Sequence, residues 1–291
     1  MRNDSKIIYS FSTKGVKKPY KKKNLLPLII ALILLGLAIL TITKILFKKN
    51  EPKELSTEAT QEVVSISEDE INIDSNDFKN MYQIFETIDG QTAYIAIKET
   101  FSGKDSLPII IYSHGSTYTI TEDKSNPLLK DLEMYAKEAV KNGYIFAASN
   151  QHGDNWGNNQ SIEDTRKLIE YINYNFPSSG DIYLIGFSMG GLPTMNFAAK
   201  YPERIKKIAL LAPTSYATAW NQARVDIITE IPIQIWHGNK DVNVPYSMST
   251  SLIKRLSSYG KNVDLITVDG KGHFDIDTEL ITDIFDYFKT E

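Results

Sequence analysis

Short apolar runs separated by polar segments of helical length repeat along residues 81–291. The runs are rich in β-branched and aromatic residues, which is typical of buried strands. The expected strands are 81–87, 92–97, 109–112, 144–148, 182–185, 208–211, 233–236 and 263–268. The expected helices are 126–142, 161–175, 192–200, 217–228, 247–259 and 277–289. Strands that alternate with helices predict an α/β domain, with a mostly parallel sheet covered on both faces.

Three local signals mark the ends of these elements. Asp89-Gly90 between the first two strands is a hairpin signal. Asn126 followed by Pro127 predicts an N-cap and a first helical residue. Ser161 with Asp164 three residues later resembles a capping box, and predicts that the next helix starts there.

The N-terminal part of the chain has a different pattern. Residues 25–43 form a run of 19 positions without a charged residue, which is long enough to span the hydrocarbon core as a helix. The heavier basic load precedes this run, so residues 1–24 are expected in the cytoplasm. A cleaved signal peptide is the alternative, but the run is long and no small-x-small site follows it. We therefore expect an uncleaved transmembrane signal anchor at residues 25–47.

Residues 48–80 are rich in polar and acidic side chains and contain few large apolar residues. This composition predicts a flexible tether with a reach of roughly 30 Å. The predicted organisation is therefore a basic tail, an anchor, a tether and a folded domain at 81–291. In this topology the protein is a single-pass protein of the cell membrane, and its folded domain lies outside the cytoplasm.

Charge and composition narrow the function classes. Residues 1–50 hold eleven Lys or Arg and one Asp, while the whole chain has a net charge of −4, so the remainder carries −14. An acidic domain argues against nucleic acid as a partner. The chain has no cysteine, which excludes disulfides, thiol nucleophiles and a lipoprotein anchor. Four histidines leave little material for a metal cluster, so neither a metal nor a cofactor is expected.

The strongest chemical signal is Gly186-Phe187-Ser188-Met189-Gly190, a G-x-S-x-G motif. It lies between an expected buried strand and an expected helix, which is the context that gives the motif its meaning. The turn is so sharp that Ser188 must adopt strained dihedrals with its hydroxyl exposed. Side chains at Gly186 and Gly190 would collide with the neighbouring strand and helix. Ser188 is therefore the expected catalytic nucleophile.

A serine nucleophile needs a base, and the base needs a carboxylate to orient it. Both partners should follow strand ends, because the active site of an open α/β sheet lies beyond the carboxyl ends of its strands. Asp241 follows the strand at 233–236, and His273 follows the strand at 263–268. Asp264 and Asp269 compete for the acid role, but they lie within or at the end of the strand before His273.

These motifs resemble the α/β-hydrolase superfamily, and within it the small serine esterases and the catalytic domains of prolyl-oligopeptidase-like enzymes. The resemblance covers about residues 81–291, and the order Ser, Asp, His along the chain is that of the superfamily. The matching segments are 114–115, 186–191, 237–245 and 272–274. The resemblance implies an α/β-hydrolase fold and a triad of Ser188, Asp241 and His273, while the short segment 214–231 predicts that the fold has no large cap domain. It also implies that His114, His152 and His237 shape loops and do not transfer protons.

Acyl transfer also needs two backbone N–H groups that stabilise the oxyanion. Met189, directly after the nucleophile, is expected to supply one of them. The other is expected from the loop after the strand at 109–112, from Ser116 or its neighbour Gly115. Because this loop lacks the His-Gly-Gly-Gly form of many lipases, the choice between the two residues stays open.

The leading functional interpretation is a carboxylesterase that acts through an acyl-enzyme on a small-molecule or cell-surface ester. A serine peptidase of the prolyl-oligopeptidase type is the alternative, and a catalytically silent binding protein on the same fold is a further one. Only 18 residues, 214–231, separate two expected strands where a lid would insert. An open site for short acyl groups is therefore predicted, with Tyr118, Tyr216 and Trp220 as candidate substrate-binding residues.

Overall fold

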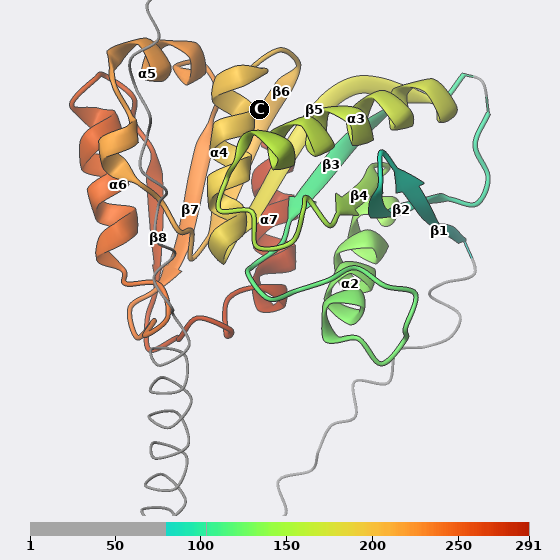
Figure 1. Ribbon diagram of the computed structural model, residues 1–291, viewed down its shortest axis with the longest axis horizontal. Coiled ribbons are helices and arrows are strands. Elements are labelled where there is room, and N and C mark those ends of the chain that lie inside the picture. Colours follow the sequence, from blue (N-terminus) through green and yellow to red (C-terminus); the bar gives the residue numbers. More distant parts are fainter. Residues whose placement is uncertain (1–79, 103, 291) are drawn as a thin grey trace, which may run out of the picture. The chain divides into compact units, whose positions relative to one another are not determined.

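One eight-stranded sheet organises the computed structural model, which describes residues 80–102 and 104–290 (Figure 1). Its strands are β1 (Met81–Ile88), β2 (Gln91–Lys98), β3 (Leu107–Ser113), β4 (Ile145–Ser149), β5 (Ser178–Phe187), β6 (Ile205–Leu211), β7 (Ile233–Gly238) and β8 (Asp264–Val268). They lie in the order β1-β2-β4-β3-β5-β6-β7-β8. β2 pairs antiparallel with both β1 and β4, and all later pairs are parallel. The predicted mostly parallel sheet is confirmed.

Helices cover both faces of this sheet (Figure 1). The α-helices are α2 (Pro127–Lys141), α3 (Asn159–Asn175), α4 (Gly191–Lys200), α5 (Gln222–Ile228), α6 (Ser247–Ser257) and α7 (Ile281–Lys289). Ile109 and Ile111 of β3 belong to the hydrophobic core formed with α3, α4, α5 and α6. Ile110 and Tyr112 belong to the core formed with α2 and α7. Because both faces of β3 are buried, its sequence is a continuous apolar run and does not alternate.

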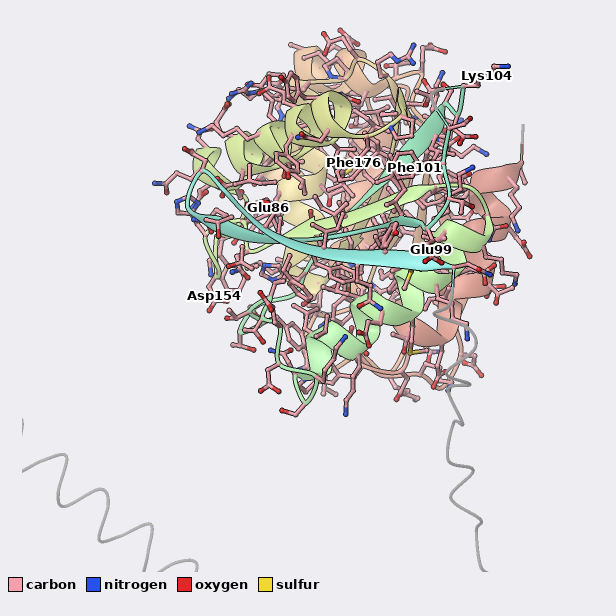
Figure 2. All side chains as sticks on the ribbon, turned by 90° about the vertical axis from the view of Figure 1, so that its right-hand side faces the viewer. Glu86, Glu99, Phe101, Lys104, Asp154 and Phe176 are labelled. Atoms are coloured by element: carbon pink, nitrogen blue, oxygen red, sulfur yellow. The ribbon has the colours of Figure 1, made fainter. Side chains whose placement is uncertain are left out.

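The β1–β2 hairpin forms one edge of the sheet. Ile88 pairs with Gln91, and the turn residues Asp89 and Gly90 have φ values of 49° and 80°. These left-handed conformations suit a two-residue hairpin turn, so the predicted hairpin is confirmed. Glu86 of β1 lies on this edge strand (Figure 2), and its carboxylate accepts a hydrogen bond from the Tyr171 hydroxyl of α3 at 3.3 Å. A charged side chain on an exposed edge strand discourages pairing with another chain.

Two helix starts test the capping predictions. Asn126 caps α2 as expected, since its side chain accepts a hydrogen bond from the backbone N–H of Leu129. The predicted capping box at Ser161 was wrong. α3 begins at Asn159, and the cap is Asn158, whose Oδ1 accepts from the Ser161 N–H at 2.9 Å. The Ser161 hydroxyl instead donates to the Asn158 carbonyl at 2.8 Å, which places Ser161 within the first turn.

The helix predicted at 217–228 is broken into two parts, a 3₁₀ turn η3 (Ala217–Ala219) and α5. Trp220 lies between them in an extended conformation and is 3% exposed. Asn221 then caps α5 by accepting from the Arg224 N–H at 3.0 Å. Burial of the Trp220 ring and this cap together end the first turn and restart the helix.

The last predicted helix also begins later than expected. A 3₁₀ turn η4 (Thr278–Leu280) precedes α7, and Asp277 stands before both. The Asp277 side chain points into the core, where it is 8% exposed and hydrogen-bonded to two tyrosines.

The predicted basic tail at 1–24, anchor at 25–47 and nearly all of the tether at 48–80 lie outside the described residues. Within residues 80–102 and 104–290, no helix is both long enough and apolar enough to cross a bilayer.

Candidate active site

Ser188 stands at the tip of a sharp turn between β5 and α4, in the short 3₁₀ helix η2 (Ser188–Gly190). Its φ is 53°, so the strained left-handed conformation expected from the motif is present. A Cβ at Gly186 would lie 2.6 Å from Thr194 Oγ1, and a Cβ at Gly190 would lie 2.0 Å from the Ser113 carbonyl oxygen. The two glycines of the motif therefore allow the close approach of β3 and α4 around the serine.

A chain of two hydrogen bonds joins the predicted triad residues. His273 Nε2 lies 2.9 Å from Ser188 Oγ, and His273 Nδ1 lies 2.7 Å from Asp241 Oδ2. The Asp241 side chain is fully buried, and its Oδ1 accepts from the backbone N–H groups of Asn243 and Val244, each at 2.8 Å. These two bonds fix the carboxylate in the orientation that meets the imidazole.

The competing carboxylates do not reach His273. Asp264 is exposed on β8, and Asp269 Oδ1 accepts from the Asn239 amide at 2.6 Å. Asp241 is therefore the carboxylate that contacts the histidine among the described residues.

The other three histidines hold loops at the carboxyl edge of the sheet. His114 is fully buried, and its nitrogens face the carbonyl oxygens of Gly115 and Asn150 at 2.7 and 3.0 Å. His152 Nδ1 lies 2.5 Å from Asp164 Oδ2. Neither ring contacts Ser188.

His237 supports the loop that carries the acid. It is fully buried, with Nδ1 at 2.7 Å from Ser249 Oγ and Nε2 at 2.9 Å from the Val244 carbonyl. Burial lowers the pKa of His237, which favours a neutral ring. A neutral ring donates from Nε2 to the carbonyl and accepts from the Ser249 hydroxyl, so both nitrogens are used.

The loop after β3 brings two candidate oxyanion donors to the site. Gly115 and Ser116 line the same cavity as Ser188, and neither backbone N–H donates to an acceptor among the described residues. The next N–H, that of Thr117, is already bonded to Asp154 Oδ1 at 2.6 Å. Met189 follows the nucleophile within η2. Gly115 and Ser116 therefore both remain candidates for the second oxyanion donor, as they did from the sequence.

A cavity of about 490 Å³ opens over Ser188 and His273. Its remaining walls include Tyr118, one of the three candidate substrate-binding residues, together with two aromatic residues that sequence reasoning missed. These are Trp156 and Phe274, which are 51% and 65% exposed and stand at the rim. Phe274 directly follows His273, the predicted base, so its position in the sequence was a usable signal. Trp156 had none.

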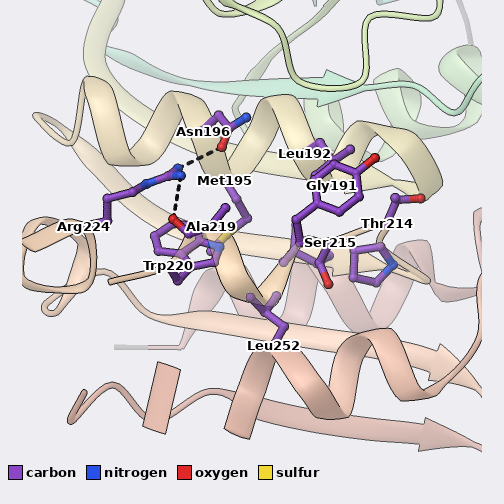
Figure 3. A pocket seen from close by; sticks show the side chains of 13 residues that line it. Gly191, Leu192, Met195, Asn196, Thr214, Ser215, Ala219, Trp220, Arg224 and Leu252 are labelled. Atoms are coloured by element: carbon purple, nitrogen blue, oxygen red, sulfur yellow. Dashed lines mark hydrogen bonds between the residues drawn. The ribbon is translucent and has the colours of Figure 1, made fainter. Parts of the chain in front are cut away.

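Tyr216 and Trp220 line a different cavity. Its volume is about 110 Å³, and it lies between α4, η3, α5 and α6 (Figure 3). Thr214 belongs to the walls of both cavities. The two predicted substrate-binding residues are therefore neighbours of the Ser188 cavity and not part of its lining.

Backbone strain concentrates at this end of the sheet. Among the described residues, eight that are not glycine have positive φ values. Six of them follow the carboxyl ends of β3, β4, β5 and β6: Thr117, Gln151, His152, Trp156, Ser188 and Ala212. Left-handed conformations cost free energy and cluster where a site must be held in one geometry. The strained residues therefore gather at the same edge of the sheet as Ser188, Asp241 and His273.

A buried carboxyl group anchors the end of the His273 loop. Asp277 Oδ2 accepts from the Tyr112 hydroxyl at 2.9 Å, and Oδ1 accepts from the Tyr135 hydroxyl at 2.9 Å. Burial raises the pKa of Asp277 to about 7, and the two hydroxyl bonds only partly oppose this shift. The group therefore titrates near neutral pH although it lies in the core.

This shift predicts a pH-dependent stability. In the unfolded chain the carboxyl loses its proton near pH 4, whereas in the folded chain it keeps the proton up to about pH 7. The protonated Asp277 carboxyl makes its full contribution to the free energy of unfolding below about pH 4. This contribution is lost as the pH rises from 4 through 7, which lowers the free energy of unfolding by up to about 4 kcal/mol. Asp277→Asn should therefore flatten the free energy of unfolding between about pH 4 and 7, measured by urea denaturation. The exposed Asp286→Asn is the control, and an unchanged slope in Asp277→Asn would contradict the assignment.

The sheet, its helical layers and the serine turn define a hydrolase of the α/β-hydrolase fold. The chain belongs to the phospholipase/carboxylesterase family, whose model matches residues 144–290. The matched region contains Ser188, Asp241 and His273. No curated protein matches the chain significantly.

Solved structures share the fold at low sequence identity. Est1E from Butyrivibrio proteoclasticus is 21% identical with a TM-score of 0.54, over 71% of this chain and 97% of that one. A thermostable esterase is 16% identical with a TM-score of 0.57, over 73% of this chain and 62% of that one. The acylaminoacyl peptidase of Pyrococcus horikoshii is 14% identical with a TM-score of 0.55, over 74% of this chain but 41% of that one.

Proposed function

We propose that the protein is a serine hydrolase that cleaves carboxylic esters through an acyl-enzyme. The observation that carries the proposal is the continuous hydrogen-bond chain from Ser188 Oγ through His273 to the buried Asp241 carboxylate. This arrangement activates a hydroxyl as a nucleophile. Membership of a family described as phospholipase/carboxylesterase supports the choice of an ester bond.

The chemistry follows from the two hydrogen bonds. As Ser188 Oγ attacks the ester carbonyl carbon, His273 Nε2 takes the hydroxyl proton, and the carbonyl oxygen becomes an oxyanion. The Met189 N–H and an N–H of the β3 loop, from Ser116 or Gly115, stabilise that charge. Collapse of the intermediate breaks the bond to the alcohol, which leaves with the proton from His273. Water then attacks the acyl-enzyme by the same route, releasing the acid and restoring Ser188.

A serine peptidase is the second candidate, because an acylaminoacyl peptidase shares the fold. The match covers 41% of that peptidase. Labelling with a fluorophosphonate probe tests for an activated serine, and hydrolysis of 4-nitrophenyl acetate against peptidyl amides then separates the two activities. A protein that takes no label would be a silent scaffold, and faster cleavage of amides would favour the peptidase.

Short acyl groups are the proposed substrates. Between β6 and β7, where a lid would insert, the chain forms only η3 and α5. No lid would therefore cover a long acyl chain, and each CH₂ left in water forgoes about 0.8 kcal/mol. kcat/KM on 4-nitrophenyl esters from acetate to palmitate should be highest for the shortest acyl groups. A maximum at long chains would contradict the open site.

We further propose that residues 25–47 anchor the enzyme in the cell membrane, with the catalytic domain outside the cytoplasm acting on small-molecule or cell-surface esters. The uncharged run and the basic residues that precede it support this topology. Protease added to intact protoplasts should remove the domain. If the domain resists the protease until the membrane is broken, the domain lies in the cytoplasm and the proposed orientation is wrong.

A further inference from the structure

The cavity next to the active site contains one charged side chain. We call it the Arg224 cavity, and its other walls come from α4, the segment after β6, η3 and α6 (Figure 3). With a volume of about 110 Å³, it has room for a few waters or one small polar group. The question is what an arginine in such a cavity would bind.

Arg224 is held firmly in place. Its Nη2 donates to Asn196 Oδ1 at 2.8 Å, and its Nη1 donates to the Ala219 carbonyl at 3.2 Å, as the dashed lines in Figure 3 show. The guanidinium also stacks over the Trp220 ring at 4.3 Å from the centroid. A guanidinium has five N–H donors. Only two are used by described residues, so three remain for a ligand.

The charge of Arg224 has no counterpart. Its two hydrogen-bond acceptors are neutral, and no carboxylate in residues 80–102 or 104–290 forms an ion pair with it. Burial accordingly lowers the pKa of Arg224. A partly desolvated, preorganised guanidinium without a partner is suited to bidentate binding of a carboxylate.

The Arg224 cavity adjoins the nucleophile. Thr214 lines both cavities, and its N–H donates to the Ser188 carbonyl at 2.8 Å. The hydroxyls of Thr214 and Tyr216 form no hydrogen bond with described residues, so they are available to hydroxyl groups of a ligand. Asn196 lies eight positions after Ser188, which at a rise of about 1.5 Å per residue places it roughly 12 Å further along the helix axis.

We infer that Arg224 binds a carboxylate on the alcohol part of the ester substrate, roughly 12 Å from the scissile bond. The inference rests on the proposed esterase function. A short acyl group cannot span that distance, so the carboxylate belongs to the alcohol. The free hydroxyls between the two points favour a polyhydroxylated alcohol, such as a glycan chain that contains uronic acids.

Binding can be measured without catalysis. The full chain with Ser188→Ala is titrated calorimetrically with trigalacturonate and with the neutral galactose trimer. The acidic trimer should bind at least tenfold more tightly, and its affinity should fall as salt is raised. Equal affinities for the two trimers would overturn the inference.

Arg224→Gln and Arg255→Gln form a matched pair in the same background. Like Arg224, Arg255 contacts Trp220: its Nε donates to the Trp220 carbonyl at 2.8 Å. Arg255 likewise has no ion pair among the described residues. It differs from Arg224 because it does not line the cavity. Arg224→Gln should remove the preference for the acidic trimer, Arg224→Lys should keep part of it, and Arg255→Gln should keep it. Equal losses in the two glutamine variants would indicate a structural role and overturn the inference.

The catalytic measurement separates this inference from the function on which it rests. The protein with Ser188 intact should release acetate from O-acetylated trigalacturonate with a higher kcat/KM than from the acetylated neutral trimer, and Arg224→Gln should shrink that ratio at least tenfold. Hydrolysis of both trimers at equal rates would overturn the anion site alone. Failure to cleave any ester, 4-nitrophenyl acetate included, would overturn the esterase and leave the calorimetry to decide the site.

Discussion

Ser188→Ala is expected to lower kcat for 4-nitrophenyl acetate by about a million-fold, because without the hydroxyl no acyl-enzyme forms. The fold should survive, since the substitution removes one oxygen from a residue that is 8% exposed and whose hydroxyl contacts only His273 among the described residues. Activity is measured together with the thermal midpoint. An inactive protein with an unchanged midpoint is the expected result.

His273→Ala provides the companion measurement. It should lose about as much as Ser188→Ala, and the double variant should be no worse, because members of a triad act as a unit. Full esterase activity in the Ser188→Ala protein would show that another group is the nucleophile. Additive losses in the double variant would show that the two residues act separately.

Asp241→Asn is expected to lower kcat by about ten-thousand-fold. Asp241 Oδ1 is committed to the N–H groups of Asn243 and Val244, so the new amide nitrogen would take the place of Oδ2, facing His273 Nδ1. An amide donates where the carboxylate accepted, which forces the imidazole into the tautomer with a proton on Nε2. That tautomer cannot take the proton of Ser188.

The control for Asp241→Asn is Asp269→Asn. Asp269 also precedes the His273 loop, but its carboxylate binds Asn239 and does not reach the ring. The Asp269→Asn substitution should change kcat less than tenfold. A larger loss in Asp269→Asn than in Asp241→Asn would reverse the assignment of the acid.

The sheet was predictable because its inner strands, β2 to β7, are largely buried on both faces, so each contains a compact apolar run that stands out from polar surroundings. The positions of Ser188, Asp241 and His273 were predictable for a related reason. Parallel strands all end at one edge, so residues that follow different strands meet there although 85 positions separate Ser188 from His273.

The missed features depend on side chains that meet across elements. The break at Trp220 arises because its ring is buried beneath Arg224, and a local helical pattern carries no information about that contact. Asp277 was assigned to the start of a helix, where an acidic residue is common. Its partners Tyr112 and Tyr135 lie on β3 and α2, far away in sequence.

The left-handed conformation of Ser188 sets stability against activity at a single position. A non-glycine residue at φ 53° destabilises the folded chain by about 1 kcal/mol, and glycine at this position would relieve that cost. Selection for heat resistance alone would therefore favour Ser188→Gly, a substitution that removes the proposed nucleophile. A variant library of this enzyme should be screened for turnover and thermal tolerance together, because ranking by melting temperature would enrich inactive clones.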